Sequence, residues 1–306
     1  MKKFITLAAL GFLTSAYAQS SYMKDKAFYV FSDGYVAKVE ADGKVSWKTS
    51  PIKQVGDLWV FKNSILFTTF NGVKEITRDT NTERVCYQPP EKPEIYATQK
   101  LDNGNYLVAE CTAARLLEVK PDNTIVKEIK LGKAPAGHGF MRGVRKTPQG
   151  TYLVGHMGGK LKEYTDKGEV VWFFNDPAMG SIYQAVRLKN GNTLASFGEN
   201  DKAAVAEIAP DKTIVWSVKN ADLLGQGQPE PHPMKFCTGF FLLPNGNLLL
   251  TSWIGHGHLG KSPHLFEITR DKKIVWSYAD HTAFKTICSV HPLNEKGEPL
   301  DPAGVH

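Results

Sequence analysis

One phrase repeated along the chain constrains the fold more than any other feature of this sequence. It consists of a polar turn, a short β-branched run and a closing Trp, a pattern typical of a strand after a tight turn. Degenerate copies end at Cys86 and Lys127, and the last residues of the six copies are 39, 41, 45, 44 and 60 residues apart. A regular period of this length indicates a repeat architecture. The complete copies are Asp42–Trp47, Lys167–Trp172, Asp211–Trp216 and Asp271–Trp276.

A second phrase precedes each of the later copies and predicts a hairpin. Asn-Gly or Gln-Gly is followed by apolar residues, and a tight primed turn favours this pair because it requires positive φ. Each unit therefore reads as four antiparallel strands in roughly 40 to 50 residues, which describes a propeller blade. The copies of this phrase are Asn103–Val108, Gln149–Val154, Asn190–Leu194 and Asn245–Leu250.

The two ends of the chain predict how the ring closes. The first unit has three strands, at 27–32, 35–40 and 44–49, and lacks an innermost one. An unpartnered strand at 286–293 ends the chain and can complete that blade, which removes an exposed sheet edge. We therefore predict an all-β protein, a single six-bladed β-propeller of four-stranded antiparallel blades closed by the C-terminal strand. No helical periodicity is long enough to assign a helix.

The N-terminus predicts export. Lys2 and Lys3, the apolar run 4–13 and Ala16-Tyr17-Ala18 fit a cleaved signal peptide at 1–18, which leaves the propeller at 19–306. No Cys follows the cleavage site to carry a lipid anchor, and no later apolar stretch is long enough to span a membrane. We expect a periplasmic or secreted monomer.

The charge pattern bears on partners. Without the two leader lysines the chain has 35 basic and 31 acidic residues, a net charge of +4, and these charges are scattered. This distribution is typical of a solvated surface and argues against a nucleic-acid partner.

The Trp phrase carries a family resemblance. Gly43–Trp47 and Gly168–Trp172 resemble the blade motif of pyrroloquinoline-quinone-like propeller repeats, in which the Trp wedges between blades. The alternation with Leu243–Asn247 is similar to arylsulfotransferase-type propellers. The resemblance is architectural and shared by many functions. Quinone enzymes of this type have longer eight-bladed rings and an adjacent Cys pair, so we do not expect a quinone cofactor here.

Assigning loops to the two faces of the ring places most histidines together. Hairpin connections alternate between faces, so the Asn-Gly and Asp-Lys turns share one face, which we call the lower. The crossovers between blades and the loops from second to third strand share the upper face. The two long insertions of the last blade, 221–234 and 254–263, also fall there, and long ordered loops are usually functional. Seven of the nine histidines map to the upper face: His138, His156, His232, His256, His258, His264 and His281.

The upper face offers candidates for binding and catalysis. Arg142, near the upper end of an innermost strand, could grip a carboxylate or sulfate bidentately or be satisfied within the channel. Gln184 and Thr238 occupy corresponding places and, with Glu199, are candidate ligand-binding residues. The candidate catalytic residues are His138, Arg142, His156 and His232.

A metal site is a further possibility on this face. His256 and His258 form a His-x-His pair that can present both rings to one divalent ion. A zinc site needs a third ligand, for which His138, His156, His232 or Glu199 are the candidates.

The four cysteines suggest one disulfide. Cys237 and Cys288 fall near the starts of innermost strands in neighbouring blades. A disulfide between them would link the closing strand covalently to the neighbouring blade. Cys86 takes the inter-blade position of the Trp, which favours a buried thiol.

Two functions remain open from the sequence. The first is an exported propeller that binds a small polar or anionic ligand or a glycan on the upper face. The alternative is a His-dependent or metal-assisted hydrolase, lyase or group transferase, arylsulfotransferase-like, that uses the same face. The sequence contains no specific catalytic signature that decides between them.

Overall fold

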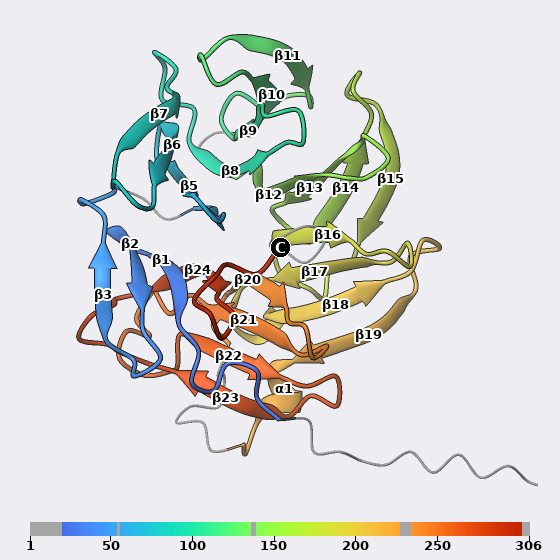
Figure 1. Cartoon of the computed structure of the whole chain (residues 1–306). Coiled ribbons are helices and arrows are strands. Elements are labelled where there is room, and N and C mark those ends of the chain that lie inside the picture. Colours follow the sequence, from blue (N-terminus) through green and yellow to red (C-terminus); the bar gives the residue numbers. More distant parts are fainter. Residues whose placement is uncertain (1–19, 54–55, 136–138, 227–233, 302–306) are drawn as a thin grey trace, which may run out of the picture.

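The chain folds into six four-stranded antiparallel sheets arranged as a ring (Figure 1). The computed structural model describes residues 20–53, 56–135, 139–226 and 234–301, so the predicted signal peptide lies outside the described residues. The predicted six-bladed β-propeller is confirmed. In the part of the chain that the structure describes, no helix is long and apolar enough to cross a membrane.

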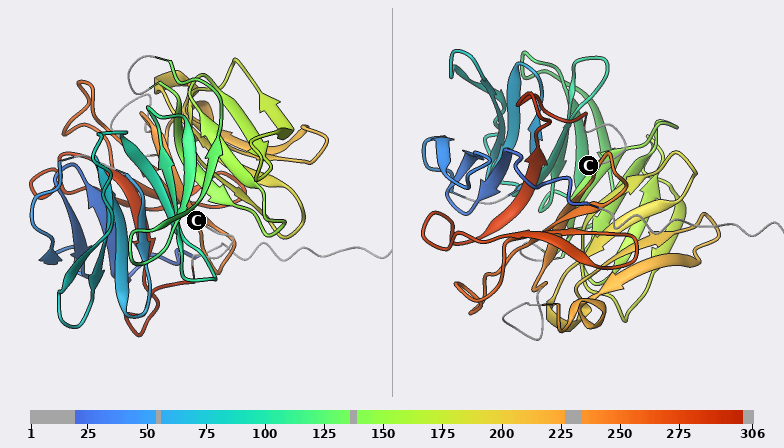
Figure 2. Two further views of the ribbon diagram at one scale, coloured as in Figure 1. Left: turned by 90° about the horizontal axis from the view of Figure 1, so that it is seen from above. Right: turned by 60° about the horizontal axis from the view of Figure 1, so that its bottom comes forward.

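Each blade runs from an inner strand, which lines the central channel, to an outer strand at the rim (Figures 1 and 2). Blades 1 to 3 are β24 (Ile287–Pro292), β1 (Phe28–Ser32), β2 (Tyr35–Val39) and β3 (Val45–Lys48); β4 (Leu58–Val60), β5 (Ser64–Thr69), β6 (Gly72–Thr77) and β7 (Glu83–Tyr87); and β8 (Ile95–Lys100), β9 (Tyr106–Glu110), β10 (Arg115–Val119) and β11 (Ile125–Lys130). Blades 4 to 6 are β12 (Met141–Lys146), β13 (Tyr152–His156), β14 (Lys160–Tyr164) and β15 (Val170–Asn175); β16 (Ile182–Arg187), β17 (Thr193–Phe197), β18 (Ala204–Ile208) and β19 (Ile214–Lys219); and β20 (Cys237–Leu242), β21 (Leu248–Ser252), β22 (Leu265–Ile268) and β23 (Ile274–Tyr278).

The C-terminal strand closes the ring as the sequence predicts. β24 pairs antiparallel with β1, with Val290 opposite Val30, so the first blade combines the two ends of the chain. All six residues of β24 are buried. Closure in this way removes an inner sheet edge and joins blade 6 to blade 1.

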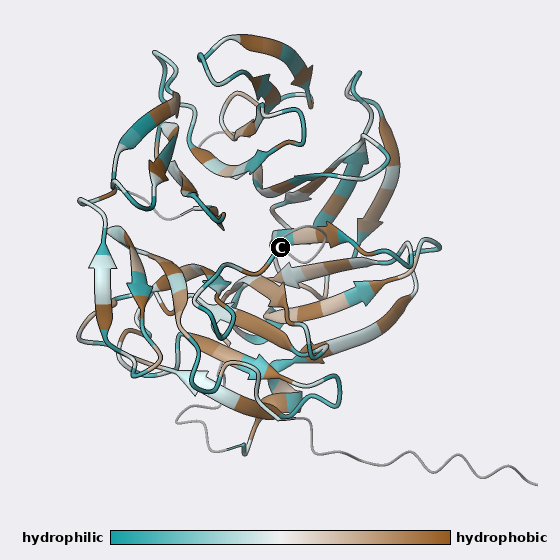
Figure 3. Cartoon of the chain, in the orientation of Figure 1, coloured by the Kyte–Doolittle hydropathy of each residue, from teal (hydrophilic) through white to brown (hydrophobic). Residues whose placement is uncertain are grey.

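Apolar layers between neighbouring blades form the core. There are six such clusters in the described residues, and each combines side chains of two adjacent blades. Figure 3 shows the corresponding alternation of hydrophobic and hydrophilic residues along the strands. One of these clusters packs blade 6 against blade 1. The core is therefore continuous around the ring.

The repeated Trp lies at these seams. The indole N–H of Trp172 donates to the carbonyl of Pro210, and that of Trp216 to the carbonyl of Arg270, each in the lower turn of the next blade. Trp47 likewise donates to Asn81 of blade 2. Cys86, at the same place in blade 2, is fully buried in the apolar layer with blade 3, which confirms the sequence prediction.

The Asn-Gly hairpins form, but with a different turn from the predicted primed one. Gly104 has φ of +81°, whereas Asn103 does not have positive φ. The Asn103 side chain instead accepts from the amide of Asn105, and Leu101 pairs with Asn105 across the turn. Only the glycine therefore needs the left-handed conformation. A short helix α1 (Asn220–Leu223) and a 3₁₀ turn η1 (Asn200–Lys202) also correct the expectation of no helix.

Buried or half-buried glutamates on the third strands form a second set of contacts between blades that the repeat analysis missed. Glu75 binds Lys100 at 2.9 Å, Glu118 binds Lys146 at 2.6 Å, and Glu163 binds Arg187, in each case on the next blade. In blade 6 the equivalent Glu267 accepts hydrogen bonds from Ser21, Tyr22 and Met23 of the N-terminal segment. The segment after the predicted leader therefore binds Glu267 in the way that a basic side chain of the next blade binds the glutamates of blades 2 to 4.

Glu75 gives a testable pH dependence. Burial alone would raise the pKa of its carboxyl, but hydrogen bonds from Lys100, Ser64, Tyr106 and Arg84 outweigh burial and lower the pKa to about 2. A lowered folded-state pKa gives stability that is present above the unfolded-state value and is lost as pH falls through the folded-state value. We expect this carboxylate to contribute on the order of 3 kcal/mol that disappears between about pH 5 and pH 2.

Urea unfolding of the Glu75→Gln variant across that pH range checks the expectation. The variant should be less stable than the parent near neutral pH, and the difference should shrink as the pH falls. Parallel stability curves for the two proteins would show that the charge of Glu75 is not responsible.

Candidate functional site

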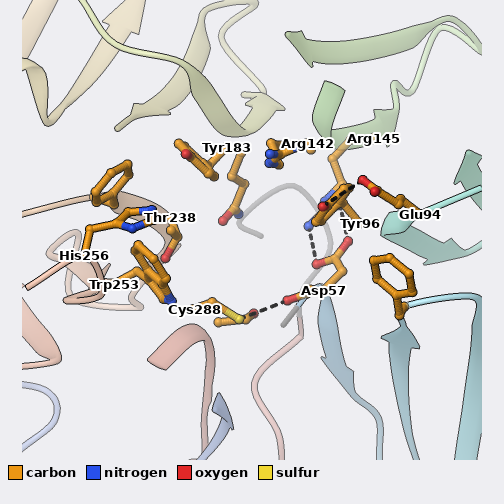
Figure 4. A pocket seen from close by; sticks show the side chains of 16 residues that line it. Asp57, Glu94, Tyr96, Arg142, Arg145, Tyr183, Thr238, Trp253, His256 and Cys288 are labelled. Carbon is orange, nitrogen blue, oxygen red and sulfur yellow. Dashed lines mark hydrogen bonds and ion pairs between the residues drawn. The ribbon is translucent and has the colours of Figure 1, made fainter. Parts of the chain in front are cut away.

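A cavity of about 490 Å³ opens at the upper end of the channel. The starts of the inner strands and the loops between second and third strands line it, which agrees with the face assignment made from the repeat. Four of the predicted catalytic, ligand-binding and metal residues line this cavity: Arg142, Gln184, Thr238 and His256. Figure 4 shows Arg142 of blade 4 and Thr238 and His256 of blade 6 around the same space.

The Arg142 guanidinium lies over an aromatic ring. Arg142 is the second residue of β12, and its guanidinium carbon lies 4.1 Å from the ring centroid of Tyr96 on β8. Nη1 donates to the carbonyl of Met141 at 3.2 Å. Burial raises the pKa of the Tyr183 hydroxyl, and the charge and hydrogen bonding of Arg142 oppose that rise. Stacking engages a face of the guanidinium, while its N–H donors lie in the plane of the group.

A buried ion pair that sequence reasoning missed forms one side of the cavity floor. Arg145 Nη1 and Nη2 bind Asp57 Oδ2 and Oδ1 at 2.6 and 2.9 Å, and both side chains are less than 10% exposed. The Arg145 guanidinium also lies 4.7 Å from the Trp59 ring centroid, and Asp57 accepts from the amide of Thr98. Asp57 comes just before β4 and Arg145 lies in β12, so the pair links blades 2 and 4 past the inner strand of blade 3.

The Gln184 side chain is hydrogen-bonded to the backbone of the neighbouring blade. Its amide donates to the carbonyl of Phe240 at 3.1 Å and accepts from the amide of Phe240 at 2.9 Å, which joins blades 5 and 6. Gln99 accepts from the amide of Lys146, and His291 from the amide of Val60, at the seams of other blades. Polar residues at corresponding places on the inner strands therefore tie neighbouring blades together.

Of the predicted catalytic histidines, only His156 lies among the described residues, and it does not line the cavity. His156 is buried at the end of β13, where its ring nitrogens face the Phe140 carbonyl and the Tyr164 hydroxyl. Burial lowers the pKa of His156 to about 4, so it is neutral near pH 7. This places His156 in the packing of blade 4, away from the cavity lining. His138 and His232 lie outside the described residues, and among those described only His256 lines the cavity.

The predicted metal ligands are not assembled in the described residues. No group of three His, Cys, Asp or Glu side chains there is placed to hold a metal ion. Glu199 accepts a hydrogen bond from Ser181 at 2.8 Å, and neither Glu199 nor His258 lines the cavity. His258 belongs to the same long loop as His256 but is partly buried.

The predicted disulfide between Cys237 and Cys288 is not formed. All four cysteines are free and buried. The Cys237 thiol faces the carbonyl of Gly239, whereas the Cys288 thiol faces the carbonyls of Phe31 and Gly56. The correction has a simple cause, because adjacent inner strands fix the two side chains in different inter-blade layers. Burial raises the pKa of both thiols, which opposes formation of the reactive thiolate.

A second cavity of about 480 Å³ lies at the lower end of the channel. Lys100, Lys146 and Arg187 line it, and each is bound to one of the third-strand glutamates described above. Arg145 lines both cavities. The Asp57–Arg145 pair therefore stands between the upper and lower chambers.

Comparisons with known proteins support the architecture. No protein-family model matches the chain, and no curated protein matches it either. Among solved structures, a protein of unknown function from Bacteroides caccae is similar at 25% identity with a TM-score of 0.74, covering 89% of this chain and all of that one. A catalytically inactive virginiamycin B lyase from Staphylococcus aureus with quinupristin is similar at 16% identity, TM-score 0.57, over 92% and 96% of the two chains.

The WD40 propeller domain of Doa1 is similar at 10% identity with a TM-score of 0.54, over 76% and 73% of the two chains. These likenesses show the fold. They support the six-bladed propeller and do not establish membership of the quinone-type or arylsulfotransferase-type repeat families.

Proposed function

We propose that this protein binds a small polar ligand with an anionic group in the upper cavity, and that Arg142 recognises the anion. The observation that carries the proposal is the stacking of Arg142 on Tyr96 at the wall of a concave site. A guanidinium fixed by stacking loses little freedom when its in-plane donors bind a carboxylate or sulfate. The volume of the cavity falls in the range of small-molecule sites.

The other charged groups of the cavity support Arg142 as the recognition residue. Arg145 is bound bidentately to Asp57, so its charge is neutralised within the protein. The Tyr96 hydroxyl donates to Glu94 at 3.1 Å, so the ring that lies under Arg142 is itself held by a carboxylate of the same strand region. The predicted leader makes the periplasm or the exterior the proposed place of action, and a glycan with an acidic group fits the same proposal.

Binding is favoured here over the catalytic alternative. A His-dependent transferase, lyase or hydrolase needs a nucleophile or a base together with residues that orient it. Among the described residues, His256 is the candidate at the cavity, and its ring contacts Trp253 and Phe236. His156 is held in the blade interior. Virginiamycin B lyase shares the fold, but a shared fold does not carry an activity.

Sulfate titration at constant ionic strength tests the proposal. The parent should bind sulfate, and Arg142→Gln should weaken binding by about tenfold or more, because a charge-assisted hydrogen bond is lost. Arg142→Lys keeps the charge but removes the planar fork, so an intermediate affinity is expected. Lys212→Gln, in a lower turn, is the matched control and should bind like the parent.

The opposite pattern would contradict the proposal. Sulfate binding that survives both Arg142 variants and is lost in Lys146→Gln would place the anion in the lower cavity.

A further inference from the structure

The upper cavity has two chemically different sides. Figure 4 shows Trp253 and His256 on one side, Tyr96, Glu94 and Asp57 on the other, and Tyr183 and Arg142 between them. One side is therefore a wall of rings from blades 5 and 6, and the other carries charged groups from blades 2 to 4. We call the first side the aromatic wall and define it as Tyr183, Phe236, Trp253 and His256.

The rings of the aromatic wall support one another. Tyr183 and Phe236 have centroids 6.2 Å apart at 89°, and Phe236 and Trp253 are 5.2 Å apart at 87°. Trp253 and His256 continue the series at 4.9 Å and 74°. Edge-to-face contacts of this kind are favourable and fix the orientation of each ring. All four side chains are at least partly accessible, so the wall presents apolar surface to the cavity.

Two glycines make room for these rings. A Cβ at Gly255 would meet the Trp253 ring at 2.1 Å, and a Cβ at Gly198 would meet the Tyr183 ring at 2.3 Å. His256, directly after Gly255, has φ of 54°, which is uncommon for a residue with a side chain. The backbone is thus shaped to keep the aromatic wall in place before any ligand enters.

Resting on the proposed function, we propose that the ligand is an aromatic carboxylate, with its ring on the aromatic wall and its carboxylate on Arg142. A flat ring matches the rigid rings through offset or edge contacts. A carboxylate matches the planar donors of Arg142. The two sides of one cavity therefore select a molecule that has both features, and neither a simple anion nor an uncharged ring uses both.

Four probes separate the contributions: benzoate, acetate, benzyl alcohol and glucuronate. Their affinities are measured by calorimetric titration, or by ligand-observed NMR where binding is weak. We expect benzoate to bind about tenfold more tightly than acetate, because burial of a ring adds apolar and aromatic contact. Benzyl alcohol lacks the charge and should bind more weakly than benzoate. Glucuronate carries its carboxylate on a hydroxylated, non-aromatic ring and should also bind more weakly.

Variants assign the gain to the aromatic wall. Trp253→Leu should bring the affinity for benzoate down to that for acetate, and Phe236→Leu should do the same if the first variant does not fold. Phe173→Leu is the matched control, because Phe173 is 38% exposed on β15 at the outer rim and does not line the cavity. It should keep the full preference for benzoate, and circular dichroism checks that each variant is folded.

The possible outcomes distinguish the two proposals. Equal affinities for acetate and benzoate, both dependent on Arg142, would leave the proposed function and overturn the inference. Tighter binding of glucuronate would overturn it in favour of a sugar acid. Binding of benzoate that does not depend on Arg142 would overturn both proposals, whereas failure of all four probes while sulfate still binds at Arg142 would overturn the inference alone.

Discussion

Replacing Asp57 with Ala lowers the free energy of unfolding by about 3–5 kcal/mol, because the Arg145 charge is left buried without a partner. The geometry supports a value of this size. Both side chains are less than 10% exposed and the guanidinium binds the carboxylate bidentately. A surface pair would contribute only about 0–1 kcal/mol. Urea unfolding of the parent and the variant measures the difference.

A double variant distinguishes the unpaired charge from simple loss of packing. Asp57→Ala combined with Arg145→Met removes both charges, and we expect it to recover a large part of the lost stability. A double variant as unstable as Asp57→Ala alone would show that the cost does not come from the stranded charge. A cost below about 1 kcal/mol for the single variant would show that water reaches the pair.

Ending the chain before Thr286 prevents folding to a stable propeller. The truncation removes β24, whose six residues are all buried, and leaves β1 and the inner edges of blades 6 and 2 uncovered. The backbone N–H of Val60 also loses its hydrogen-bond acceptor, a ring nitrogen of His291. Ile287, Val290 and Leu293 leave two inter-blade layers, and at about 1.5–3 kcal/mol for each buried side chain the loss is comparable with the 5–15 kcal/mol by which typical domains are stable. Expression yield, proteolysis and thermal melting measure the effect.

The control for this truncation ends the chain after Asp301. It keeps β24 and also Leu300, whose carbonyl faces the His291 ring at 2.9 Å. This shorter deletion should melt like the parent. A protein ending before Thr286 that melts cooperatively at the parent temperature would contradict the account of ring closure.

The ring could be predicted because its determinants are local and repeated. A polar turn, a β-branched run and a Trp recur six times in complete or degenerate form, and the count of strands at the two ends leaves one solution for closure. The faces of the ring follow from the alternation of hairpins, which is why Arg142, Gln184, Thr238 and His256 were placed around one opening.

The partners of these residues could not be predicted because they depend on which inner strands face each other. Gln184 looked like a ligand-binding side chain, yet it pairs with the Phe240 backbone across a seam. His156 follows the second strand of its blade, but its ring turns into the blade interior. Cys237 and Cys288 lie on neighbouring strands, and their thiols face different carbonyls.

The sequence contains features that could have pointed to the aromatic wall, but the repeat analysis did not use them. Trp253 is a Trp outside the repeated phrase, directly followed by a long Gly-rich loop, and Phe236 precedes an inner strand. Their convergence with Tyr183 depends on contacts between blades 5 and 6, which no local pattern specifies. Asp57 and Arg145 were missed for the same reason, since 88 residues separate the two partners.

The location of a bound anion tests the central claim most directly. Crystals soaked in selenate, an isostere of sulfate with an anomalous signal, reveal where a tetrahedral anion is held. We expect an anomalous peak in the upper cavity within hydrogen-bonding distance of the Arg142 guanidinium, and no such peak in crystals of Arg142→Gln. A peak confined to the lower cavity beside Lys100 and Lys146, with none at Arg142, would contradict the account.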